Sequence, residues 1–438
     1  MDSKSIKSAF LDYFRTQDHK IISGASLLPR NDPSLLFINS GMAPMKPYFT
    51  GAAQPPHPRL ANVQACIRTN DIDDVGDMHH LTLFEMLGSW SINDYYKEEA
   101  VEFAYDLLTK GLGLDPAKLY VSVYSGNVDK GLDYDRTSHD AWLAMGVPES
   151  RIVAFGDEDN FWGPAGTEGP CGPCTEVFID TGTPGDETSY EATGKFDTQK
   201  RYVEIWNAGV FMELYKDQAG NFTRLKQHNV DTGAGLERLT MAINGLSNVY
   251  ETDIYTGLNS VIANAASKSN LTTGALEAKR VLADHVRAAS FIISEGVFPD
   301  KNKEGYIPRR LIRRAVAVSS KLGIESFPYA DAIDAVIEYS GNDYPVLKER
   351  ADFIKSVVEQ ETTSFSKILK QGEKALLKVI RHESSNGISG MAAFNLTASH
   401  GIPLDILITM AEQQGRTIDI AGYNAAMDQH KEMSRKPA

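Results

Sequence analysis

The sequence predicts an α+β fold, in which a largely antiparallel sheet flanked by helices is followed by a mostly helical domain. In the N-terminal half, short apolar segments typical of buried strands cluster between turn signals without a regular alternation of strand and helix. From residue 231 onward, apolar residues recur with a period near 3.6, and strand signals are few. At about 150 residues per domain, 438 residues form two or three domains. We therefore predict one domain over residues 1–245 and a second over residues 246–438.

The chain begins with a predicted helix over residues 5–17, because Ile6, Phe10 and Phe14 fall on one helical face. The predicted strands cover residues 35–39, 60–68, 81–88, 119–123, 175–180 and 202–207, and they are interrupted by helices over residues 98–112 and 138–145. The later helices are expected over residues 235–244, 253–266, 275–294, 309–322, 346–381 and 418–435.

The composition narrows the class of protein. Hydrophobic residues make up 42% and charged residues 23%, which excludes wholesale disorder. The net charge of −14 repels phosphate backbones, so contact with nucleic acid requires a local basic surface. No apolar run approaches the roughly 20 residues of a membrane span, and three cysteines, an odd number, fit a reducing compartment. We expect a cytoplasmic protein that does not contact membranes.

The first segment that carries chemistry is a strand, an acidic turn and a second strand between residues 59 and 91. Arg68 lies near the end of the first strand and Phe84 on the second. A guanidinium held by a strand can bind a phosphate bidentately, and a nearby ring can stack on a nucleotide base. The alternative is a surface hairpin with an ordinary Arg–Glu pair and a core Phe.

A second segment, residues 229–239, reads NVDTGAGLERL. We interpret Asp231 as part of a small-residue turn in which Gly233 and Gly235 allow close backbone approach, followed by a helix that carries Arg238. A helix N-terminus behind a glycine turn favours anions. The alternative is a plain helix cap with Asp231 as the capping residue.

Two further segments indicate a particular function less clearly. Cys171 and Cys174 form a CxxC pair, but no second pair lies at finger spacing, so we expect no zinc. The surrounding Gly- and Pro-rich loop displays Trp162 and suits the wall of a small-molecule pocket. Four arginines on one predicted helix share a face that either binds RNA or is solvated and paired with local Glu; they are Arg309, Arg310, Arg313 and Arg314.

Taken in order, these segments resemble the class II aminoacyl-tRNA synthetases, and within them the alanyl-tRNA synthetase family. The resemblance runs from Ala9 to Arg435 and includes NDPSLLFINSGM, CIRTNDIDDVG, TLFEMLGSWS, DNFW, GPCGPCTE, EIWN, VDTGAGLERL and GYIPRRLIRRA. It implies a class II antiparallel sheet and an alanine–tRNA ligase, which uses ATP with Mg²⁺ to form alanyl-adenylate and transfers alanine to the 3′ end of tRNA(Ala). No metal-ligating residue is assigned.

The resemblance also implies roles for individual residues. Arg68 would bridge the α-phosphate and the amino-acid carboxylate, and Arg238 would bind the γ-phosphate; these are the two residues implied to be catalytic. Phe84 would stack on adenine, with Met42 also in the ATP site. The alanine site would contain Asp231, which pairs with the ammonium group, together with Gly233, Trp162 and Asn207. The tRNA would contact the four arginines above together with Lys301 and Asn302.

Several positions depart from the family pattern. The acidic turn over residues 69–75 is short, and one residue is inserted between Asn207 and Val210. Lys301 and Ala398 stand where the family reads a G·U pair of the acceptor stem with an asparagine and an aspartate, so the stem is read differently or less strictly. We expect no editing domain, and we expect a monomer that mischarges tRNA with serine unless a separate deacylase acts in trans.

Two other functions stay open at this stage. A paralogue could adenylate a small amino acid for an acceptor other than tRNA, and the residues at 301 and 398 favour this alternative. A non-catalytic RNA-binding module is the third candidate. The presence of both arginines, Phe84 and Asp231 argues against it, because such a module would need no phosphate-binding groups.

Overall fold

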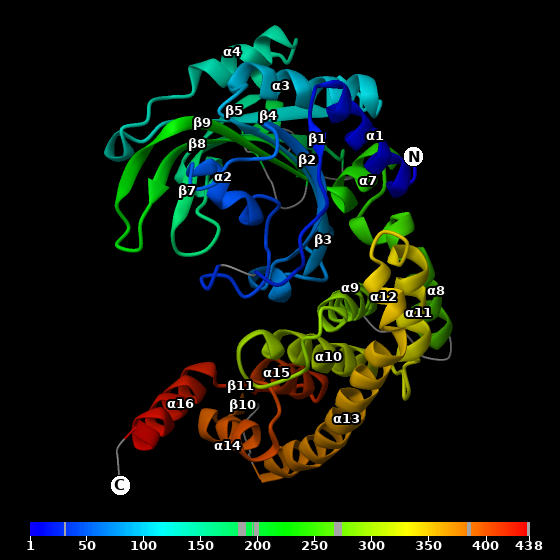
Figure 1. Ribbon diagram of the computed structural model, residues 1–438. Coiled ribbons are helices and arrows are strands. Elements are labelled where there is room, and N and C mark those ends of the chain that lie inside the picture. The colour runs from blue at the N-terminus through cyan, green and yellow to red at the C-terminus, as the bar shows by residue number, and fades with distance from the viewer. Residues whose placement is uncertain are drawn as a thin grey trace. The chain divides into compact units, whose positions relative to one another are not determined.

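The computed structural model describes residues 1–29, 32–182, 190–194, 196, 201–266, 274–382 and 387–435 (Figure 1). The chain divides into two compact units, Met1–Ser260 and Val261–Ala438. This division lies C-terminal to the boundary expected at residue 245, because the intervening segment packs on the first unit. The backbone N–H of Val249 donates to the carbonyl of Met78 (3.0 Å), and the Tyr250 hydroxyl donates to the carbonyl of His80 (2.9 Å).

The first unit is built on one sheet of nine strands. Eight follow the order β1-β2-β3-β9-β8-β7-β4-β5, and β6 pairs with β7. Neighbours are antiparallel except for β1 with β2 and β4 with β5, which confirms the predicted α+β fold. The strands are β1 (Lys20–Ile21), β2 (Arg59–Ile67), β3 (Leu83–Ile92), β4 (Leu119–Tyr124), β5 (Ile152–Phe155), β6 (Phe161–Trp162), β7 (Gly169–Asp180), β8 (Tyr202–Lys216) and β9 (Phe222–Gly235).

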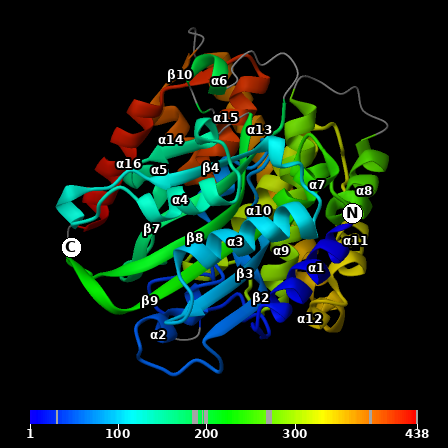
Figure 2. The same cartoon turned by 90° about the horizontal axis from the view of Figure 1, so that it is seen from above.

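Helices cover one face of this sheet, as Figures 1 and 2 show for α3 and α4. The covering helices are α1 (Ser3–Thr16), α3 (Lys97–Asp106), α4 (Arg136–Ala144) and α7 (Leu236–Asn244). The face predicted for α1 is the buried one, since Phe10 and Phe14 pack against Trp206 of β8 at ring-centre distances of 5.8 and 6.3 Å. Shorter helices are α2 (Lys46–Phe49), α5 (Asp157–Asn160) and α6 (Tyr190–Thr193).

Two sequence predictions about strands are wrong. Residues 35–39 form no strand; Phe37 and Ile38 are buried in an irregular segment, so their apolar character reflects packing alone. The hairpin formed by β8 and β9 extends well beyond the predicted strand 202–207. Its outer part consists mostly of polar residues, four of which have exposed side chains on β9 (Thr223, Arg224, Lys226 and His228), so it lacks the apolar pattern by which strands are recognised.

The second unit is helical, as predicted. Its helices are α9 (Ala275–Ser294), α10 (Lys303–Lys321), α11 (Tyr329–Ser340), α12 (Pro345–Glu349), α13 (Ala351–His382), α14 (Gly390–His400), α15 (Leu404–Gln413) and α16 (Ile420–Arg435), with β10 (Gly387–Ile388) paired to β11 (Thr417–Ile418). Helix α8 (Thr256–Ala266) spans the division. The helix predicted over 346–381 is two helices, because the chain leaves helical geometry at Arg350.

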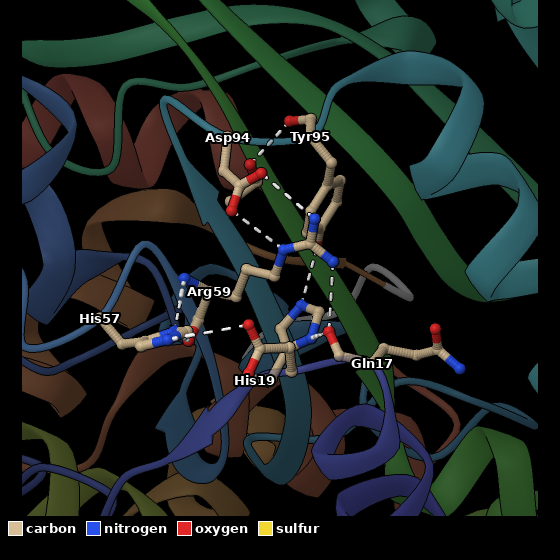
Figure 3. A network of polar contacts seen from close by, with 8 residues as sticks. Gln17, His19, His57, Arg59, Asp94 and Tyr95 are labelled. Atoms are coloured by element: carbon tan, nitrogen blue, oxygen red, sulfur yellow. Dashed lines mark hydrogen bonds and ion pairs between the residues drawn. The ribbon is translucent and has the colours of Figure 1, made fainter.

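A network of polar contacts fixes the end of α1 to the sheet edge (Figure 3). The Arg59 guanidinium donates to the Asp94 carboxylate (3.0 and 3.2 Å) and to the Gln17 carbonyl (3.2 Å). His19 lies beneath it, with Nδ1 3.0 Å from the same carbonyl and Nε2 3.1 Å from the Tyr95 hydroxyl. Because a carbonyl only accepts, Nδ1 carries the proton and Nε2 accepts from Tyr95. Burial lowers the pKa of His19 to about 4, so the ring is neutral in the folded protein.

The buried ring of His19 predicts a loss of stability in acid. An unfolded histidine titrates near pH 6.5, so between about pH 6.5 and 4 the unfolded chain binds one more proton at this position. The free energy of unfolding should fall by up to about 1.4 kcal/mol per pH unit in that window. Urea unfolding at pH 7 and pH 5 measures this loss, which should be smaller in His19→Gln. His228→Gln, at an exposed position, should retain the wild-type loss; an unchanged loss in His19→Gln would contradict the prediction.

Candidate active site

A cavity of about 140 Å³ opens on the sheet face opposite the covering helices. Of the residues that the sequence analysis assigned to a substrate site, most line it; they are Arg68, Phe84, Trp162, Asn207, Asp231, Gly233 and Arg238. Met42 does not. Its side chain is fully buried and packs in the apolar cluster below, next to Met86 and Trp90.

The floor of the cavity is set by the register of β3 against β9. Three pairs of residues face each other there: Met86 with Gly235, Gly88 with Gly233, and Trp90 with Asp231. Since side chains alternate along a strand, these residues all point to the cavity side. A Cβ atom at Gly233 would lie 2.8 Å from the Met86 sulfur, so only glycine leaves this side chain in place.

Asp231 therefore lies within a strand, and the turn predicted around it is wrong. The small residues that suggested a turn are held extended because β9 pairs with β3 on one side and β8 on the other. The Asp231 side chain is 6% exposed and accepts a hydrogen bond from the Trp90 indole (Nε1 to Oδ1, 2.7 Å). Burial raises its pKa to about 7, and the indole bond acts in the opposite direction. A cationic group entering the cavity would favour the ionised carboxylate.

Arg68 and Phe84 come together through the predicted hairpin of β2 and β3. Arg68 follows directly after β2, and its backbone N–H donates to the Thr82 carbonyl (3.0 Å). Its guanidinium carbon lies 4.9 Å from the centre of the Phe84 ring, and Nε donates to the Asn39 carbonyl (3.4 Å). The guanidinium thus covers the ring that was expected to stack on a base.

Arg238 enters the cavity from the first turn of α7, which Gly235 precedes as its N-cap. Its guanidinium donates to the Glu204 carboxylate (3.0 Å) and to the Glu204 carbonyl (3.1 Å). The predicted arrangement of a glycine followed by a helix start with an arginine is therefore present. Both the helix N-terminus and the side chain favour an anion at this end of the cavity.

Four acidic residues that line the cavity were not singled out from the sequence, although all lie in segments that carry the resemblance: Asp71, Glu176, Glu204 and Glu237. Glu176 of β7 accepts a hydrogen bond from the Asn207 amide (3.0 Å), and Glu204 binds Arg238. Burial, and next to it the charge of Glu204, raise the pKa of Glu176 well above its usual range. Two mutually repelling carboxylates form the kind of oxygen donor set that a divalent cation prefers.

A β-bulge lies between Asn207 and Val210, where the sequence analysis expects an inserted residue. Asn207 pairs with Gly233 and Val210 with Asp231, so β8 takes three steps where β9 takes two. On a regular strand, positions three apart point to opposite faces. With the bulge, both Asn207 and Val210 line the cavity.

A histidine pair adjoins Arg238. His80 bonds to the Asp77 carboxylate through Nδ1 (2.5 Å), and His79 Nε2 lies 3.8 Å from the same carboxylate. In the part of the chain that the structure describes, these three groups form the cluster compact enough to share a metal ion. The hydrogen bond that His80 donates to Asp77 raises the pKa of His80 despite its burial, whereas the charge of Arg238 lowers it. An Asp–His ion pair beside an arginine accounts for this geometry.

The CxxC segment belongs to strand β7 rather than to a loop, and β6 pairs against it through Trp162 and Gly172. Both thiols are buried, Cys171 beside Tyr124 and Cys174 in the cluster below the cavity. Burial raises the pKa of Cys171 to about 11. The two cysteines pack in different apolar clusters and so do not form a chelating pair.

The four arginines of α10 do not present one open face. Arg313 is buried, bonds to Glu361 of α13 (2.6 Å) and lies over the Phe365 ring; Arg309 approaches the same carboxylate (3.7 Å). Burial lowers the pKa of His285, and the charges of Arg314 and Arg310 act in the same direction. The exposed candidates for RNA contact are Lys301 and Asn302, just before α10.

Comparisons with known proteins show the family of the chain. The sequence profile of the tRNA synthetases class II (A) matches residues 5–438. The alanine–tRNA ligase of Borrelia hermsii is 39% identical over the whole chain, which spans 73% of that protein. The alanine–tRNA ligases of Natranaerobius thermophilus and Dehalococcoides mccartyi are 40% and 38% identical, and the chain spans 49% of each, about half their length.

Proposed function

The chain belongs to the class II (A) family of tRNA synthetases, which are aminoacyl-tRNA ligases, and we propose that it activates alanine with ATP and transfers the alanyl group to tRNA(Ala). One observation carries this proposal. Two arginines from separate elements, Arg68 and Arg238, line the same cavity as a buried carboxylate, Asp231. Such a cavity suits a small amino acid at one end and a triphosphate at the other.

The proposed first step needs no side-chain nucleophile. The alanine carboxylate attacks the α-phosphorus of ATP, a new oxygen–phosphorus bond forms, and pyrophosphate leaves. Asp231 holds the ammonium group, while Arg68 neutralises charge shared between the carboxylate and the α-phosphate, and Arg238 holds the γ-phosphate. Catalysis is then positioning together with electrostatic stabilisation by fixed charges.

The family implies a divalent cation bound with ATP, and Glu176 and Glu204 fit it. The pKa of Glu176 is raised by burial and by the neighbouring carboxylate, a repulsion that a cation between them would relieve. We propose that these two residues hold Mg²⁺, which when bound would offset the negative charge of the phosphates. Arg238, now bonded to Glu204, would be free to turn toward the triphosphate.

For the tRNA, we propose contact through the second unit at Lys301 and Asn302. Both are exposed, and the Asp300 carboxylate accepts their backbone N–H groups (2.6 and 3.1 Å). Lysine offers a mobile point charge where the family has an amide, so this contact would favour phosphate over a specific base edge. Arg313, held by Glu361, supports the helix instead.

The function is tested by alanine-dependent exchange between ATP and pyrophosphate, followed by transfer of labelled alanine to tRNA(Ala). Arg68→Ala and Arg238→Ala should each lower the exchange kcat/KM by about 10²-fold or more, since each removes a charge that stabilises the transition state. Arg136→Ala, at an exposed position of α4, should retain wild-type exchange. No exchange with alanine would overturn the proposal. Exchange without transfer to tRNA would favour an adenylating enzyme with another acceptor.

The pKa of Asp231 predicts a pH dependence for alanine. At a pKa of about 7, half of the free protein carries a protonated Asp231 at pH 7. Because the ammonium group binds the ionised form, kcat/KM for alanine should fall up to about tenfold per pH unit below that value. Exchange assays from pH 6 to pH 8.5 measure it. The kcat/KM for ATP, measured at saturating alanine, should not fall in this pH range. If kcat/KM for alanine does not fall either, the prediction is contradicted.

The same cavity predicts weak rejection of serine by the 438-residue polypeptide. Serine adds only a hydroxyl to alanine, and a small pocket discriminates against such an addition by about 10²-fold. Exchange assays with serine and alanine should give kcat/KM values in about that ratio, and tRNA(Ala) should accumulate seryl product. A serine-to-alanine ratio below about one in 10⁴ would contradict the prediction, because the pocket would then reject the hydroxyl actively.

A further inference from the structure

A tryptophan that does not line the cavity lies directly behind its buried carboxylate. Trp90 of β3 is fully buried and is the cross-strand partner of Asp231 on β9. Its indole Nε1 donates to Asp231 Oδ1 at 2.7 Å. Within the described residues, this is the one hydrogen bond made by the Asp231 side chain. The orientation of the carboxylate therefore depends on the indole.

The surroundings hold the indole in one position. A Cβ atom at Gly88 would lie 2.5 Å from the indole ring, and one at Gly41 would lie 2.8 Å from it, so two glycines make room for the ring. Trp90 belongs to a buried apolar cluster that also contains Met45 and Phe49. Close packing of a buried ring restricts its rotation, so the N–H stays directed at Asp231.

The cationic side chains of the cavity do not compete for this carboxylate. Arg238 is bonded to Glu204, and the Arg68 guanidinium lies over Phe84. A buried carboxylate without a cation is costly unless it is hydrogen-bonded. The indole bond thus stabilises a negative charge that the protein leaves available for a ligand.

We propose that Trp90 is a positioning residue for recognition of the amino-acid substrate: its N–H fixes Oδ1 of Asp231, so that Oδ2 is presented to the ammonium group. This inference rests on the proposed function. A fixed carboxylate has less freedom to lose when the substrate binds. The ammonium contact is equally present in the ground state and the transition state, so its loss should appear in KM rather than in kcat.

Trp90→Phe tests this, because it keeps an aromatic ring and removes the donor. Hydrogen bonds to charged groups correspond to about 10- to 100-fold in binding, so KM for alanine should rise by about that factor in the exchange assay. The kcat and the KM for ATP should change by less than about threefold. A folded Trp90→Phe protein with unchanged KM for alanine would overturn the inference while leaving the proposed function intact.

Trp142→Phe is the matched control. Trp142 is also fully buried and donates its indole N–H to a side chain, Thr175 Oγ1, at 2.8 Å. The substitution removes the same atoms from a core position that does not contact Asp231. Its KM for alanine should stay at the wild-type value. A rise equal to that of Trp90→Phe would mean that loss of any buried indole has this effect, and would overturn the inference.

A double-mutant cycle separates positioning from general support of the sheet. If Trp90 acts through Asp231, then adding Trp90→Phe to Asp231→Asn should change KM for alanine by less than about threefold, because the carboxylate is already absent. Additive effects would overturn the inference. Where exchange is too slow to measure, the rise in Tm caused by alanine can be compared among the same variants.

If Trp90→Phe does not fold, Gly41→Ala serves as the second variant, because its Cβ atom displaces the same indole. It should raise KM for alanine; an unchanged KM would overturn the inference.

Discussion

The site depends on the antiparallel register of β3 and β9 at the centre of the sheet. That register sets Trp90 opposite Asp231 and Gly88 opposite Gly233, so one face of two neighbouring strands supplies a carboxylate, its hydrogen-bond donor and the space above them. A slip of one residue would turn these side chains to the face covered by helices. Because both faces of the sheet are buried, such a slip would be costly, and the register of β3 against β9 is therefore fixed.

The cavity keeps opposite charges apart. The carboxylate of Asp231 is bonded to a neutral indole, and the guanidinium of Arg238 is bonded to Glu204, which lines the same cavity. A buried pair between Asp231 and an arginine would satisfy both charges and leave little attraction for a ligand. Under the proposed function, these separate pairings leave Asp231 available to an ammonium group and Arg238 to a phosphate.

Part of this site could be predicted from the sequence. The hairpin that carries Arg68 and Phe84 follows from two apolar runs around an acidic turn, and the helix start that carries Arg238 follows from its glycine. The strand around Asp231 could not, because its small residues are extended only by pairing with two neighbours. The acids Glu176 and Glu204 were missed since each is a single carboxylate in an apolar strand, with no local pattern that marks its partner.

The sequence by itself determined the class of fold, the helical character of the second unit and the identity of the residues that carry the family resemblance. Only the tertiary structure decided which of them meet. Trp90 and Asp231 are 141 positions apart, and no local periodicity encodes a strand register over that distance. The same holds for Arg313. Helical spacing predicts that it shares a face with three other arginines, but in the structure α10 packs against α13 and Arg313 is a buried partner of Glu361. Local patterns reflect local geometry, whereas pairing and burial depend on the whole chain.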